Sequence, residues 1–234
     1  MLTSLSSEKC AFIQTGINPA NTAVFSKPVE LHIWKLTTLH ANQIDYGLFS
    51  DAEMQRSTQI KNTKARQLHD SSRFLMRKLF ASYLSVEPGL LAFEKNAAGK
   101  PFLLEAGHLE YNLTHSGNNM YLAVSNQGMV GIDLESIRHE VDWLKIARRV
   151  LDEDTVNAIQ SHTDPQQEFT RQWTLFEARQ KLLGVGIFGQ SAETSPVLSH
   201  CYINSWQPDR NSWLSVAWTN PLLPDKLSCY EITE

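Results

Sequence analysis

Two acidic side chains stand two residues apart in the stretch GIDLE, residues 131–135. Asp133 and Glu135 alternate with isoleucine and leucine, a pattern typical of a β-strand. Residues i and i+2 of a strand project from the same face, so these two carboxylates repel each other unless solvent or a cation intervenes. Magnesium is commonly held by one or two carboxylates together with substrate phosphates. The strand therefore predicts either a solvent-facing acidic pair or half of a magnesium site.

A second group of chemically capable residues lies in WTLFEARQKLLGVG, residues 173–186. In a helix, Trp173, Glu177 and Lys181 fall at positions i, i+4 and i+8, one above another on a single face. Taken alone, Glu177 and Lys181 form an ordinary ion pair, and Trp173 suits a core position. Beside the acidic strand, however, the same face offers a third carboxylate and a cation.

Three arginines occupy one side of an expected helix over residues 64–84. Arg66, Arg73 and Arg77 are separated by seven and four residues, which places them near one line along the helix. Such a line is either a solvated surface stripe or a phosphate-binding surface.

Hydrophobic periodicity predicts the elements that position these residues. Alternation predicts strands at 29–36 and 129–137 and hairpins over 109–125 and 201–219, and a period of three to four predicts helices at 64–84, 142–160 and 166–183. This order predicts an α+β fold of two lobes with similar make-up.

Composition narrows the class of protein. The chain has 234 residues, of which 42% are hydrophobic, enough for one large domain or two small lobes. A net charge of −4 argues against a dedicated nucleic-acid binder. The three cysteines show no metal-binding spacing and favour a reducing, cytoplasmic location. No segment reaches the roughly 18 consecutive apolar residues of a membrane span, so no membrane partner is expected.

Five short motifs occur in a set order over roughly residues 64–190: GKP (99–101), YNLTHS (111–116), GIDLE, W-x-x-x-E-A-x-x-K (173–181), and G-x-G at Gly184 and Gly186. This ordered set resembles the Sfp-type 4′-phosphopantetheinyl transferases, which move phosphopantetheine from coenzyme A to a serine of carrier proteins. The resemblance implies two pseudo-symmetric α+β lobes in one chain, with the active site between them. Residues 1–118 would form the lobe that contacts coenzyme A phosphates, and residues 119–234 the lobe with the metal-binding carboxylates. With both lobes in one chain, a monomer is expected.

The resemblance also assigns site residues. Asp133, Glu135 and Glu177 match the metal-binding acids, for magnesium or alternatively manganese. The expected coenzyme A contacts are Thr114 and His115 at its phosphates, Lys100 in the nucleotide pocket, Lys181 beside the pyrophosphate, and Arg73 at the 3′-phosphate, with Arg66 and Arg77 as alternatives to Arg73.

Two positions depart from the family pattern. Phe176 stands where the family usually has a lysine, and Thr114 replaces the more usual serine. Phe176 points about 100° away from Glu177 on a helix, so it need not line the metal site. Thr114 keeps a hydroxyl and can make the same hydrogen bond.

The implied reaction transfers the phosphopantetheine arm to a serine of an apo acyl or peptidyl carrier protein, depends on magnesium and releases 3′,5′-ADP. Lys181 and Glu177 are the expected catalytic residues, with Glu177 as the base. Two other functions suit similar residues: a metal-dependent nucleotide hydrolase, or a catalytically silent homologue that binds carrier proteins. No role is assigned to residues 1–28.

Overall fold

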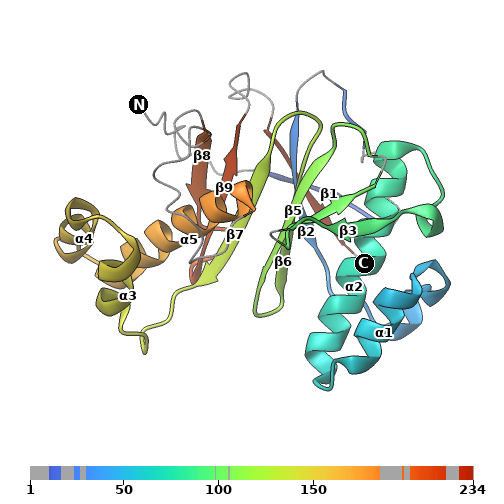
Figure 1. Cartoon of the computed structure of the whole chain (residues 1–234). Helices are drawn as coiled ribbons and strands as arrows, with labels where there is room; N and C mark the ends of the chain where they lie inside the picture. The colour runs from blue at the N-terminus through green and yellow to red at the C-terminus, as the bar shows by residue number, and fades with distance from the viewer. Residues whose placement is uncertain are drawn as a thin grey trace.

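The computed structural model describes residues 11–16, 24–26, 30–97, 99–104, 106–184, 197, 201–219 and 227–233 (Figure 1). The α-helices in these ranges are α1 (Asp51–Gln59), α2 (Thr63–Leu84), α3 (Trp143–Val150), α4 (Glu153–Gln160) and α5 (Pro165–Leu183). The strands in these ranges are β1 (Phe12–Thr15), β2 (Leu31–Leu36), β3 (Phe93–Lys95), β4 (Pro101–Leu103), β5 (Glu110–Ser116), β6 (Asn119–Ser125), β7 (Val130–Ser136), β8 (Tyr202–Trp206), β9 (Ser212–Trp218) and β10 (Leu227–Ile232).

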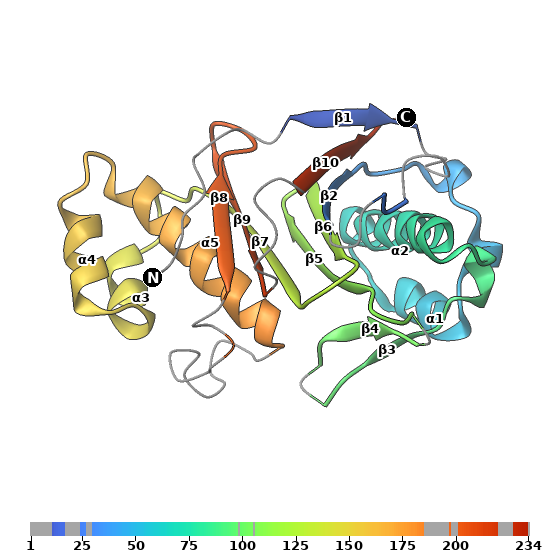
Figure 2. The same cartoon turned by 90° about the horizontal axis from the view of Figure 1, so that it is seen from above.

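The elements stack in four layers, seen edge-on in Figure 2: helices, sheet, sheet, helices. Helix α2 covers the outer face of one sheet, ordered β1-β10-β2-β6-β5. Helix α5 covers the outer face of the other sheet, ordered β7-β9-β8. The expected α+β architecture is therefore confirmed.

The two sheets repeat one connection pattern. In the first lobe β2 leads into the α1–α2 helices and then the β5–β6 hairpin, and β6 returns to pair antiparallel with β2. In the second lobe β7 leads into α3–α5 and then the β8–β9 hairpin, and β9 returns to pair antiparallel with β7. This shared strand order, β2-β6-β5 and β7-β9-β8, gives the two lobes their pseudo-symmetry.

The boundary expected after residue 118 falls in the turn of the β5–β6 hairpin. Both β6 and β10 follow that residue in the sequence, yet both belong to the first sheet, where β10 pairs in parallel with β1 on one side and β2 on the other. Sheet membership therefore extends the first lobe to residue 125 and returns the C-terminal strand to it.

Side chains at helix ends explain where the second-lobe helices begin and end. Asp152 accepts a hydrogen bond from the backbone N–H of Thr155 and starts α4, which divides the single helix expected at 142–160 into two. Helix α5 begins after Asp164 with proline at its first position and ends at Gly184, whose φ of 69° is left-handed.

The core has a separate apolar layer on each side of the first sheet. Strand β2 is buried on both faces, with Leu31 and Ile33 packed between the two sheets and Trp34 and Leu36 packed against α2. Both sheets are thereby fixed relative to their helices and to each other, because buried apolar contacts are dense and resist sliding.

The cysteines differ in state. Cys201 is a buried free thiol. Cys229 is disulfide-bonded, so the expectation of reduced cysteines is wrong at this position. In the described part of the chain, no helix combines the length and the apolar character that crossing a membrane requires.

Candidate active site

Strand β7 and helix α5 meet at Gly131. A Cβ atom at this residue would lie 2.1 Å from the carbonyl oxygen of Ala178 and 2.3 Å from the nitrogen of Leu182. Only glycine allows so close an approach of the two backbones. The contact places the α5 side chains Glu177 and Lys181 beside the carboxylates that β7 presents on the same face as Gly131.

Asp133 is the most deeply buried acid of the group, with 3% of its surface exposed. Its Oδ1 accepts hydrogen bonds from Lys181 Nζ at 2.7 Å and from Thr114 Oγ1 at 3.4 Å. Its Oδ2 is buried and bonds to no group in the described residues. Burial raises the pKa of Asp133, while the Lys181 ammonium and these hydrogen bonds oppose the rise.

Glu177 and Glu135 are coupled to this buried acid. Burial, the charge of Asp133 and then that of Glu135 raise the pKa of Glu177 to about 7, against the opposing charge of Lys181. Glu177 Oε1 is buried and also lacks a hydrogen-bond partner in the described ranges. Burial and the charge of Asp133 raise the pKa of Glu135, while Arg138, Lys181 and a hydrogen bond from Trp173 lower it.

These observations fit a divalent cation with oxygen ligands. Two buried carboxylate oxygens without partners and a third coupled carboxylate form the kind of donor set that magnesium takes. The described residues hold no ready-made group of three or more His, Cys, Asp or Glu side chains that could bind a metal ion. The ammonium of Lys181 forms an ion pair with Asp133 and neutralises its charge.

A row of polar side chains on β5 joins the two sheets. Asn112 Oδ1 accepts a hydrogen bond from Ile132 N at 3.0 Å, and Thr114 Oγ1 accepts one from Leu134 N at 3.2 Å. Further along, Ser116 Oγ lies 3.0 Å from Ser136 Oγ. The two residues of each pair are 20 positions apart in the sequence. The β5 side chains therefore bond to β7 where a neighbouring strand would otherwise pair with it, and they fix the register between the lobes.

Hydrogen bonds within this junction occupy every donor and acceptor position of the Thr114 hydroxyl. Besides accepting from Leu134 N, its Oγ1 accepts from Lys181 Nζ at 3.2 Å and donates to Asp133. A hydroxyl offers one donor and two acceptor sites, so all three are taken. The structure thus places Thr114 against the Asp133–Lys181 pair.

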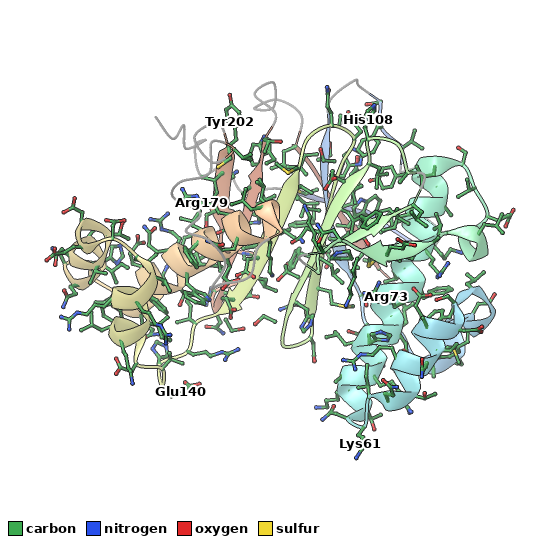
Figure 3. The ribbon with its side chains drawn as sticks, viewed as in Figure 1. Lys61, Arg73, His108, Glu140, Arg179 and Tyr202 are labelled. Carbon is green, nitrogen blue, oxygen red and sulfur yellow. The ribbon has the colours of Figure 1, made fainter. Side chains whose placement is uncertain are left out.

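His115 lies on the face of β5 that is turned toward α2, the helix that carries Arg73. His115 is exposed and alternates with Thr114, so it shares the α2 face of the strand with Tyr111 and Leu113. Arg73 projects from the middle of α2 (Figure 3), and its charge opposes the burial that raises the pKa of Tyr111. The structure therefore separates the expected phosphate contacts into an α2 side and an α5 side of β5.

Burial distinguishes the three arginines of α2. Arg77 is 1% exposed, and its guanidinium donates to Glu53 Oε2 at 2.7 and 3.0 Å and to the carbonyls of Pro88 and Leu91. The hydrogen bonds of the Arg77 guanidinium thus hold α2 against α1 and the segment that follows α2. Arg66 is exposed at the edge of a cavity of about 450 Å³, and Arg73 has no ion pair among the described residues.

Lys100 and Phe176 both have protein partners. Lys100 reaches across the lobe junction to β7 and to the end of α5. Phe176 packs against Trp173 in a tilted arrangement with ring centroids 5.9 Å apart, so the aromatic ring in place of a lysine extends an aromatic row along α5. Gly186 of the G-x-G motif lies outside the described residues.

Sequence reasoning missed the roles of Gly131, Asn112 and Ser116. A glycine within a strand signals close backbone approach, and that signal was present in GIDLE. The alternating polar residues of β5 were visible too, but a polar strand face does not reveal which backbone it will meet.

Comparison with known proteins shows similarity to one enzyme family. The family model described as the 4′-phosphopantetheinyl transferase superfamily matches residues 129–219, which contain Asp133, Glu135, Glu177 and Lys181. The 4′-phosphopantetheinyl transferase HetI of Nostoc sp. is 32% identical over 179 residues, covering 72% of this chain and 74% of its own. The 4′-phosphopantetheinyl transferase gsp of Aneurinibacillus migulanus is 30% identical over 156 residues, covering 63% of this chain and 64% of its own. The 4′-phosphopantetheinyl transferase AcpT of Escherichia coli K12 is 32% identical over 138 residues, covering 55% of this chain and 68% of its own.

The chain belongs to the 4′-phosphopantetheinyl transferase superfamily and is an enzyme of that class.

Proposed function

We propose that this transferase attaches the 4′-phosphopantetheine arm of coenzyme A to a serine hydroxyl of an apo acyl or peptidyl carrier protein, with release of 3′,5′-ADP. The observation that carries the proposal is the group of coupled carboxylates on β7 and α5 with Lys181 among them. Such a group suits a reaction whose chief need is neutralisation of phosphate charge.

In this proposal Asp133, Glu135 and Glu177 would hold the magnesium ion, or a manganese ion in its place. When bound, the ion would neutralise charge that develops on the pyrophosphate oxygens. The buried oxygens of Asp133 and Glu177 that lack partners among the described residues support this assignment.

The cations would bind coenzyme A on both sides of β5. Lys181, whose side chain is 30% exposed, would contact the pyrophosphate on the α5 side. Arg73 and His115 would contact the 3′-phosphate end on the α2 side, with Arg66 as the alternative to Arg73. Thr114 already uses its hydroxyl on Asp133 and Lys181, so we assign it to holding that pair.

Glu177 would accept the serine proton. Without a bound ion, burial and the charges of Asp133 and Glu135 raise the pKa of Glu177 to about 7, and a raised pKa suits a general base near neutral pH. The serine oxygen then forms its bond to the phosphorus next to the pantetheine arm, and the bond from that phosphorus to the oxygen of 3′,5′-ADP breaks.

Both sides of the site come from one chain. The first-lobe elements β5 and α2 would supply the contacts to the 3′-phosphate end of coenzyme A. The second-lobe elements β7 and α5 would supply the carboxylates and Lys181. We therefore propose that the site lies between the lobes and that a monomer is sufficient for activity.

One assay tests the function. Enzyme, coenzyme A, magnesium chloride and an apo carrier protein are incubated, the carrier is weighed by mass spectrometry, and the nucleotide products are separated. A carrier that gains the phosphopantetheine mass with matching 3′,5′-ADP supports the proposal. Coenzyme A breakdown without that gain would instead indicate a hydrolase, and intact coenzyme A with bound carrier would indicate a silent binding protein.

A further inference from the structure

Lys100 lies where three segments of the molecule meet. It precedes β4 in the β3–β4 hairpin, which reaches from the first lobe toward the end of α5 (Figure 2). Its Nζ lies 3.3 Å from each of three acceptors: Glu110 Oε2, the Val130 carbonyl and the Leu182 carbonyl. We propose that Lys100 is a positioning residue, which locks β7 and α5 in the arrangement that catalysis needs and does not itself bind the nucleotide.

The amine of Lys100 has no capacity left for a ligand. A lysine ammonium offers three N–H donors, and the three acceptors take all of them. The side chain is only 11% exposed. A residue that contacted a phosphate would need a free donor facing solvent, so this geometry favours a role within the protein.

The Leu182 carbonyl is an acceptor that α5 itself leaves open. It is among the last four carbonyls of the helix, which have no partner further along the helix. A positive charge at this end also interacts favourably with the helix dipole. Lys100 therefore completes the C-terminal end of α5 in both hydrogen bonding and charge.

The stem of Lys100 packs on the residue that ends the helix. A Cβ atom at Gly184 would lie 3.3 Å from both Cβ and Cδ of Lys100. The lysine backbone is held as well, since Lys100 N donates to Asn96 Oδ1 and Asn96 N donates to the Lys100 carbonyl, both at 2.9 Å. We call Lys100 and its three contacts to Glu110, Val130 and Leu182 the Lys100 clamp. The lysine in this clamp is held at its backbone as well as at its side chain.

The two carbonyls that Lys100 holds belong to the two catalytic segments. Val130 begins β7, three residues before Asp133, and Leu182 directly follows Lys181 on α5. One cation therefore fixes the main chain next to both members of the Asp133–Lys181 pair. Because catalytic groups displaced by about 1 Å lose on the order of 100-fold in rate, loosening this clamp should slow the chemical step.

The inference rests on the proposed function, and its test uses the full-length enzyme. Lys100→Met keeps the packed stem and removes the ammonium. We expect kcat for carrier loading to fall at least tenfold, while the Kd for coenzyme A, measured by calorimetry without carrier protein, stays within twofold. Lys100→Arg, which restores a cationic donor, should recover most of the lost kcat. A tenfold rise in Kd with unchanged kcat would show a nucleotide contact and overturn the proposal.

Two further variants keep the test decisive. Glu110→Gln removes a charged partner of Lys100 and leaves both carbonyl contacts, so kcat should stay within twofold; a loss equal to that of Lys100→Met would contradict the clamp. If Lys100→Met fails to fold, Gly184→Ala, which crowds the lysine stem, should lower kcat without changing the Kd for coenzyme A, and unchanged kcat would overturn the proposal. Wild-type enzyme that loads no carrier would refute the proposed function, whereas active wild-type with an equally active Lys100→Met would refute the clamp alone.

Discussion

The Lys181 ammonium lies 2.7 Å from Asp133 Oδ1, and this ion pair joins α5 to β7 at the centre of the site. Asp133 is nearly buried, whereas the Lys181 side chain keeps 30% of its surface exposed. The lysine can therefore turn toward a phosphate when another cation neutralises the aspartate. This exchange of partners would couple metal binding to substrate binding.

Asp133→Ala should abolish transfer and leave the fold intact. The substitution removes a carboxylate of the proposed metal site, and we expect a loss of activity greater than about 100-fold, since even indirect support of a metal site contributes 10–100-fold. Carrier mass measures the activity, and circular dichroism checks the fold. Activity close to wild type in a folded variant would count against the metal assignment.

Without magnesium, the protein should lose stability as the pH rises from about 4.5 to about 7. The pKa of Glu177 is raised from 4.5 to about 7 in the folded state, so across this window the folded protein binds more protons than the unfolded chain. Thermal unfolding in a chelating buffer should show this decline, and Glu177→Gln should flatten it. Added magnesium should recover stability near pH 7.5 in the wild type; an equal pH dependence in both proteins would exclude this origin.

Gly131→Ala should destabilise the protein and inactivate it. The new Cβ would meet backbone atoms of α5 at 2.1 and 2.3 Å, which side-chain rearrangement cannot relieve. We expect a loss of about 2 kcal/mol or more in the free energy of unfolding, as for overpacked cores. Gly89→Ala is the matched control, because a Cβ there meets no atom within 4 Å. Denaturant titration of both variants separates the local clash from any general effect of alanine.

Substitution by methionine should lower the stability of the protein at Arg77 and weaken coenzyme A binding at Arg73. Arg77→Met removes a buried cation bonded to Glu53 and two carbonyls and should cost about 3–5 kcal/mol of stability. Arg73→Met should leave the unfolding temperature nearly unchanged and raise the Kd for coenzyme A about tenfold, as expected for one lost charged hydrogen bond of roughly 1.5 kcal/mol. If Arg73→Met binds coenzyme A normally, Arg66→Met becomes the next variant to measure.

Elements with strong periodicity were predictable from sequence. The β5–β6 hairpin and α2 have regular apolar patterns, and both were expected close to their observed limits. Helix α1 was missed because, among its residues, only Ser57 is buried, so no apolar stripe marks it. Strand β10 was missed because its parallel partners β1 and β2 lie far away in the sequence, where local patterns carry no information.

The site was predictable as a set of residues but less so as an arrangement. The spacing in GIDLE and on α5 identified the acids and Lys181, since residues on one face of a strand or helix follow from period alone. The partners of Lys100 and Thr114 depend on how β5 meets β7, which is set by tertiary packing. The choice among three arginines likewise required burial, which a helical line of cations does not reveal.

The position of β10 between β1 and β2 has a consequence for synthesis of the protein. A nascent chain that has not yet emerged from the ribosome through residue 232 exposes the β2 edge and leaves β1 without its neighbour. The strands β1 and β2, which are translated early, thus depend on β10, which is translated much later, and a product that stops before β10 would present an open strand edge prone to aggregation.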